Sequence, residues 1–173
     1  MAGILPQAVN NYNIYVGDRG ECLIGVGKVE IPELQALTSE INMAGTAGKI
    51  AVPVTGQFEA IKATIEFTMP TRQVLRTLNP NSQLITARIA GEVMDVAAGA
   101  KRIQQTTVIM RGSLTTMKLG DLEKAAAQGT SISFELDYLR VIIDDEDMLE
   151  IDKLNMIYIV DGVDYLADVR AAI

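Results

Sequence analysis

TSISFELDYLRVII, residues 130–143, alternates between hydrophobic and polar side chains along most of its length. Successive side chains of a β-strand point to opposite faces, so this alternation predicts a strand with two unlike faces. One face carries Ile132, Phe134, Leu136 and Tyr138, and the other carries Ser131, Ser133, Glu135 and Asp137. Strands of this kind are typical of antiparallel sheets that rest one face on a core and leave the other in water.

Strand patterns extend in both directions from this stretch. Gln57–Met69 repeats the alternation, with Thr64 and Glu66 on its polar face. Leu84–Val96 and Lys101–Lys118 are predicted as two long strands joined by a hairpin. Shorter strand patterns lie at 12–16, 21–29 and 148–160. The 173 residues therefore predict one domain with a mainly β fold, built from two packed antiparallel sheets as a sandwich or barrel.

Helical signals are few. Met69–Leu78 has Pro70 near its start and Pro80 just beyond its end, which predicts one short helix flanking the sheets. Val163–Ala172 is a candidate for a second helical piece. Leu122–Gln128 contains helix-forming residues between two close glycines, and it fits a loop or a single turn as well as a helix.

Residues 38–54 show little periodicity, and we expect a long loop there. Small residues and isolated large apolar ones are mixed in it, which is a pattern suited to a docking arm. The residues singled out for that role are Ile41, Met43, Gly45, Gly48 and Ile50. A surface loop without a partner explains the same residues, so both interpretations remain open from the residues alone.

Composition argues against an enzyme. The chain has no histidine and a single cysteine, Cys22, so it lacks the commonest general base, an internal disulfide and a His/Cys metal cluster. The acidic run 144–147 lacks the spacing of a calcium loop and is expected to be a solvated hairpin turn. We therefore expect no catalytic residues, no metal and no cofactor.

The charge balance and the apolar runs also limit the partners. The formal net charge of −7 opposes tight binding of nucleic acid, which depends on basic side chains. Apolar runs fall short of the ~20 residues that a membrane helix needs, so we expect no membrane segment.

Two motifs near the C-terminus are distinctive: EIDKLNMI at 150–157 and DGVD at 161–164. They resemble the C-terminal signature of major tail tube proteins from contractile-tailed phages and R-type bacteriocins. VIMRG at 108–112 and IPEL at 31–34 resemble other parts of that family. The resemblance spans nearly the whole chain and departs most at 119–129, where Ala125–Ala127 does not match the family pattern.

The resemblance implies a structural subunit of the inner tail tube. Subunits of this family form hexameric rings, their strands join into a ring-wide β-barrel, and the rings stack around a lumen. DNA passes through that lumen without specific binding, or the tube crosses a target cell envelope. The implied partners are the chain itself, the tail sheath, baseplate and tail terminator proteins, and a tape measure protein in the lumen. The implied location is a virion tail, or a phage-tail-like particle, assembled in the host cytoplasm.

Within such a tube, residues 38–54 would reach an adjacent subunit or ring. The polar strand faces would line the lumen, with Ser131, Ser133, Glu135 and Asp137 on one strand and Thr64 and Glu66 on the other. An acidic wall would repel phosphates and so favour sliding. Two alternatives stay open: a tube-like baseplate-hub or secretion-system tube protein, and a monomeric ligand-binding β-sandwich.

Overall fold

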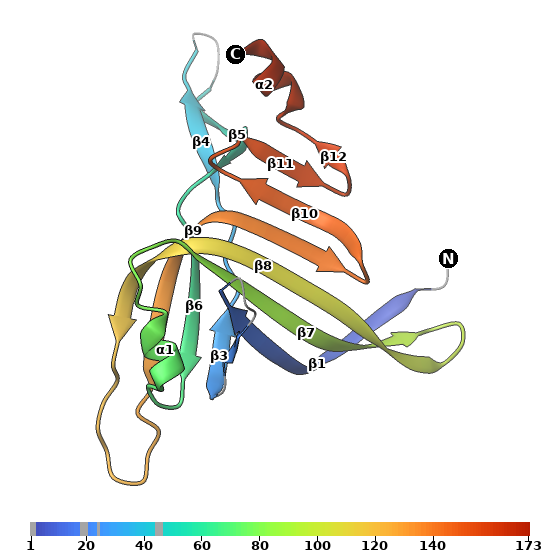
Figure 1. Cartoon of the computed structure of the whole chain (residues 1–173). Helices are drawn as coiled ribbons and strands as arrows, with labels where there is room; N and C mark the ends of the chain where they lie inside the picture. The colour runs from blue at the N-terminus through green and yellow to red at the C-terminus, as the bar shows by residue number, and fades with distance from the viewer. Residues whose placement is uncertain (1–2, 18–20, 24, 44–46) are drawn as a thin grey trace.

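The computed structural model describes residues 3–17, 21–23, 25–43 and 47–173 (Figure 1). In chain order its elements are β1 (Ile4–Val16), β2 (Glu21–Leu23), β3 (Val26–Glu30), β4 (Ala36–Ile41), β5 (Ile50–Phe58), β6 (Ile61–Phe67), α1 (Arg72–Arg76), β7 (Gln83–Asp95), β8 (Ala100–Lys118), β9 (Thr130–Ile143), β10 (Glu146–Asp152), β11 (Ile157–Val160), β12 (Val163–Asp164) and α2 (Ala167–Ala172). Within the described ranges, ten strands form one antiparallel sheet, and β4 and β5 form a separate two-stranded sheet. The predicted mainly β fold with antiparallel sheets is confirmed.

The large sheet forks at β9. One edge of β9 pairs with β8, whereas the other edge is shared between two strands. Its first half, up to Leu136, pairs with β6, and its second half, from Tyr138, pairs with β10. The sheet therefore runs β12-β11-β10-β9-β8-β7-β1-β2, with a branch through β6 to β3. Figure 1 shows this branch curling back beside β7 and β1 instead of continuing flat.

One core fills the space inside this curl. The predicted apolar parity of β9 is confirmed for Ile132, Phe134 and Leu136, which are almost fully buried. It is wrong for Tyr138, because an irregularity in the pairing with β8 after Leu136 shifts the parity, so Leu139 enters the core and the Tyr138 hydroxyl donates to Glu150. The core also takes Ile61, Ala63, Ile65 and Phe67 from β6, Ile85 and Ala87 from β7, and Ile14 from β1. Because β6 and β1 pack against the same side chains without pairing, the sheet curls without closing.

The described residues contain two short helices. α1 lies where Pro70 and Pro80 predicted it, and the Thr71 hydroxyl caps it by accepting the Val74 N–H at 3.3 Å. α2 takes the place of the possible second helical piece. Residues 119–129 contain no helix and form a loop whose ends are joined, since the Asp121 N–H donates to the Gln128 carbonyl at 2.8 Å.

Residues 38–54 are not the long loop expected from the sequence. Most of them form the β4–β5 hairpin, in which Thr38 lies opposite Pro53 and Ile41 lies opposite Ile50. The loop prediction was wrong because the alternation at 50–54 is short, and a proline such as Pro53 usually indicates the end of a strand. Proline is tolerated on an edge strand, and both strands of this hairpin are edges. Gly45 lies outside the described residues.

The base of the hairpin is fixed to the C-terminal strands. The Phe58 ring packs edge-on against Tyr158 with centroids 5.2 Å apart, and Tyr158 contacts Tyr165 at 5.7 Å. Lys153 Nζ donates to the Glu59 carbonyl oxygen at 2.7 Å. The hairpin therefore leaves the body of the protein in a defined direction, beside β11 and α2 in Figure 1.

Candidate assembly surfaces

The six residues predicted to line a lumen lie on the side of the sheet away from the core: Thr64 and Glu66 on β6, and Ser131, Ser133, Glu135 and Asp137 on β9. The hydroxyl oxygens of Thr64 and Ser133 are 3.0 Å apart, and Glu66 lies opposite Ser131. Asp137 lies at the end of this row, where it accepts a hydrogen bond from Arg111 Nε of β8 at 3.1 Å. Strand pairing thus places the predicted residues on one continuous surface.

This surface spans β3, β6, β9 and β8, and we call it the polar face. Lys62 lies opposite Glu135, and Lys28 lies opposite Glu66. On β9 we take the polar face to end at Asp137, and its charged members are then four bases, Lys28, Lys62, Arg111 and Lys118, and four acids, Glu30, Glu66, Glu135 and Asp137. Their formal charges cancel, so the expectation of an acidic wall does not hold for this face.

None of the four bases on the polar face was among the residues predicted to line a lumen. Alternation along 57–69 already puts Lys62 on the same face as Thr64 and Glu66, although it was not among the predicted lumen residues. Sequence alternation could not predict the position of the other three bases, Lys28, Arg111 and Lys118. Each lies on the polar face because its strand pairs with a strand distant in sequence.

The β4–β5 hairpin has one aliphatic face. Ile41 and Ile50 lie opposite each other, and Val52 and Val54 follow at alternate positions of β5 on the same side. These four side chains are 38–48% exposed. The other side carries Thr38, Glu40, Ala51 and Pro53, and Lys49 Nζ contacts the Glu40 carboxylate at 2.8 Å. Of the remaining predicted docking residues, Met43 is exposed just after β4 and Gly48 precedes β5.

The outer edge of β1 is long and open. Within the described part of the chain, β2 pairs only with Ile14–Val16 on that edge, while β7 occupies the other edge. Residues 4–13 therefore present backbone donors and acceptors that no strand pairs along one side, although the Tyr12 N–H donates to the Asn11 side chain at 2.8 Å. Such an edge is a template for pairing with another chain. Large apolar side chains are also exposed there, namely Ile4, Leu5 and Val9.

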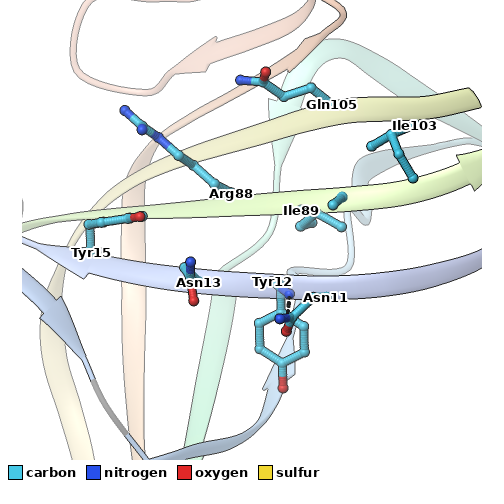
Figure 2. A pocket seen from close by; sticks show the side chains of 9 residues that line it. Asn11, Tyr12, Asn13, Tyr15, Arg88, Ile89, Ile103 and Gln105 are labelled. Carbon is cyan, nitrogen blue, oxygen red and sulfur yellow. Dashed lines mark hydrogen bonds between the residues drawn. The ribbon is translucent and has the colours of Figure 1, made fainter.

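A shallow groove of about 450 Å³ crosses the outer side of β1, β7 and β8 (Figure 2). The Arg88 guanidinium lies 5.1 Å from the centre of the Tyr15 ring, and Asn13 and Gln105 add amide groups. The lining includes no carboxylate and no thiol. It offers hydrogen bonds but no acid–base pair or nucleophile, and no metal-binding cluster of His, Cys, Asp or Glu occurs among the described residues.

The motif EIDKLNMI builds a turn between β10 and β11. Asp152 is 5% exposed and accepts hydrogen bonds from the N–H groups of Leu154 and Asn155, each at 3.0 Å, and from Asn155 Nδ2 at 2.7 Å. Burial raises the pKa of Asp152, but these hydrogen bonds and the charge of Arg111 outweigh it and hold the pKa below its ordinary value. The motif residues therefore stabilise the backbone of this turn.

The motif DGVD anchors α2. The Arg170 guanidinium forms an ion pair with Asp164 and donates to the Met156 carbonyl oxygen at 2.7 Å. The hydrogen bond from Arg170 lowers the pKa of Asp164, and a backbone hydrogen bond from Leu166 adds to the effect. These contacts join β12, α2 and the β10–β11 turn into one unit.

The predicted hairpin turn lies at the start of the acidic run 144–147, since Asp144 and Asp145 join β9 to β10, whereas Glu146 and Asp147 already belong to β10. Asp144 and Asp145 adopt positive φ values of 49° and 67°, which aspartate tolerates at tight turns. The Asp144 carboxylate accepts hydrogen bonds from Arg102 and from the Gln105 N–H.

The match to a known family covers nearly the whole chain. The model of the phage tail tube protein FII family matches residues 6–173. The chain belongs to this family. A comparison with curated proteins finds no match. The predicted family is therefore confirmed, and with it a structural component of a phage tail. None of the helices in the described residues is long and apolar enough to cross a membrane.

Proposed function

We propose that the chain is the repeating subunit of an inner tail tube, in which hexameric rings stack around a lumen. Family membership carries this proposal, and the open edge of β1 supports it. A curled sheet with free edges satisfies its backbone groups when neighbouring copies pair edge to edge into a closed barrel. A closed ring has identical contacts between successive copies, and the open β1 edge gives each copy one side of such a contact.

The polar face is our choice for the wall of the lumen. It combines hydroxyl groups with balanced charges, and it lies on the side of the sheet away from the core. Tight binding of nucleic acid requires uncompensated basic side chains, and here each acid on β9 has a base nearby on β6 or β8. DNA would therefore pass without specific binding, and a tape measure protein would occupy the lumen before DNA does.

The same proposal places the chain in a virion tail or phage-tail-like particle, assembled in the host cytoplasm. A contractile sheath would surround the tube, with baseplate and tail terminator proteins at its ends. The β4–β5 hairpin would contact an adjacent subunit or ring, because its aliphatic face is exposed in the single chain.

Negative-stain electron microscopy combined with light scattering tests the tube assignment. Concentrated purified protein is expected to form rings or hollow rods of uniform diameter. Short stacks that never elongate would favour the baseplate-hub or secretion-system alternative. A monomer at every concentration would contradict the tube proposal and favour a ligand-binding sandwich.

Thiol labelling tests the lumen wall. In a Cys22→Ser background, Glu135→Cys places one thiol on the polar face. In assembled tubes, a small maleimide should label this thiol and a maleimide attached to a long polymer should not, while both label the free protein. Labelling of tubes by both reagents would place Glu135 on the outer wall, and labelling by neither would place it in a contact between copies.

A further inference from the structure

The β4–β5 hairpin is bent near its base, where the pairing of its two strands jumps. Ala36 pairs with Phe58 at the base. The next pair is Thr38 with Pro53, so one residue of β4 lies opposite four residues of β5, and we call those four the bulge. Extra residues on one strand bend it locally. Gly56 in the bulge has a positive φ of 69°, a conformation that favours glycine. The bulge is therefore the point where the direction of the hairpin is set.

Beyond the bulge, the hairpin has little support from the rest of the chain. Residues 37–41 of β4 and 50–53 of β5 are all exposed. Within the described part of the chain, no further strand pairs with either of them. An isolated two-stranded hairpin is marginally stable in water. Its orientation relative to the body must therefore be fixed at its base.

Leu166 packs directly on the backbone of the bulge. A Cβ at Gly56 would lie 2.7 Å from Cγ and Cδ1 of Leu166, so this approach requires a residue without a side chain. Leu166 itself is only 4% exposed. A cavity of about 120 Å³ lies next to this contact, with Ile151, Met156 and Ile157 in its lining. The cavity leaves room for the hairpin to tilt if the Leu166 side chain is removed.

The C-terminal unit of β12, α2 and the β10–β11 turn holds Leu166 in this place. The Leu166 N–H donates to Asp164 Oδ1 at 3.0 Å, and the Arg170 guanidinium forms an ion pair with the same carboxylate. Arg170 also donates to the Met156 carbonyl oxygen, which ties α2 to the β10–β11 turn. In Figure 1, β5 accordingly lies beside β11 and α2.

We propose that Leu166 sets the orientation of the β4–β5 hairpin, with the bulge as the hinge and the C-terminal unit holding Leu166 against it. Loss of this contact frees the hairpin to tilt while the curled sheet stays folded, because none of the described residues of 37–53 belongs to the main core. The last residues of the chain thereby control a segment that lies more than a hundred residues earlier in the sequence. The inference concerns the single chain and holds whether or not copies assemble.

Distances between two spin labels measure the orientation of the hairpin. In a Cys22→Ser background, Ser39→Cys on β4 and Lys62→Cys on β6 provide exposed labelling positions. Double electron–electron resonance on the unassembled protein should give one narrow distance distribution. Leu166→Ala should broaden this distribution about twofold or more, because a hairpin without support at its base samples several orientations. Leu166→Met keeps the side-chain volume and should restore the narrow distribution.

Two controls separate tilting of the hairpin from general unfolding. Leu154→Ala removes a leucine of the same region that is 72% exposed, and it should leave the distribution unchanged. A label pair within the body, Lys62→Cys with Gln105→Cys, should keep its narrow distribution in Leu166→Ala. Broadening of both label pairs would assign Leu166 a general role in stability and would overturn the proposal.

Gly56→Ala tests the contact from the side of the hinge. Its Cβ would collide with Leu166, so alone it should shift the distance between the labels at 39 and 62. In the Leu166→Ala background the colliding atoms are gone, so Gly56→Ala should add no comparable shift. Additive effects would show that the two residues act separately and would count against the hinge. An unchanged distribution in Leu166→Ala would overturn the proposal as well, and would leave Phe58 and Lys153 as the contacts that fix the hairpin.

Discussion

Replacing Asp152 by alanine should destabilise the protein strongly. Its carboxylate accepts three hydrogen bonds, from the N–H groups of Leu154 and Asn155 and from Asn155 Nδ2. Hydrogen bonds to a charged group contribute about 1.5–3 kcal/mol each, and a donor left unpaired in a buried site costs about 1–3 kcal/mol. Water entering the turn would satisfy some of these donors. We therefore expect a loss of about 3 kcal/mol in the free energy of unfolding.

Urea titration of the unassembled protein, followed by circular dichroism, measures this loss. For a chain of this size a change of about 3 kcal/mol corresponds to a fall in Tm of roughly 6–12 °C. Asp168→Ala removes an exposed carboxylate from α2 and serves as the control, with an expected change below about 0.5 kcal/mol. A change for Asp152→Ala as small as that of the control would refute the structural role assigned to the motif.

The effect of pH on Asp152 gives an independent check. Its pKa is lowered in the folded state, so the folded chain binds this proton less readily than the unfolded chain. The stability from Asp152 is then fully present above the unfolded pKa of about 3.9, and it is lost as pH falls through the lower folded pKa. Asp152→Asn should flatten the acid limb of a plot of stability against pH. An unchanged acid limb would contradict this account.

Two further substitutions test the sheet and the C-terminal unit. Gly112→Ala would place a Cβ 2.2 Å from the Glu135 carbonyl oxygen on β9, so we expect urea titrations to show a loss of about 2–3 kcal/mol in the free energy of unfolding. Gly91→Ala is the control, because its Cβ would lie 3.7 Å from the nearest backbone oxygen, and it should change the free energy of unfolding by less than about 1 kcal/mol. Equal effects of the two variants would show that β8 and β9 are not so closely paired at Gly112. Arg170→Ala should speed hydrogen exchange in α2 while changing global stability by about 1 kcal/mol or less, because Arg170 is partly exposed. Arg76→Ala, in α1, is its control, and unaltered exchange in α2 would count against the anchoring role.

The departures from sequence-based expectation share one physical cause. Strand faces follow from a period of two residues, which is visible locally, and the face carrying Glu135 was predicted correctly as polar. Charge on that face depends on which strands are neighbours, and Lys62 and Arg111 come from other parts of the chain. The hairpin at 38–54 was missed because each strand is short and gains its order from the other.

What the sequence determined by itself is therefore the local part: the alternating strands, the helix before Pro80 and the acidic turn. Its C-terminal motifs also determined the family, although their role in holding turns is visible only in the structure. The tertiary structure alone decided the fork of β9, the balanced charges of the polar face and the contact of Leu166 with Gly56. Each of these depends on contacts between residues far apart in the chain. Local periodicity carries no information about such pairings, so only packing around a common core selects them.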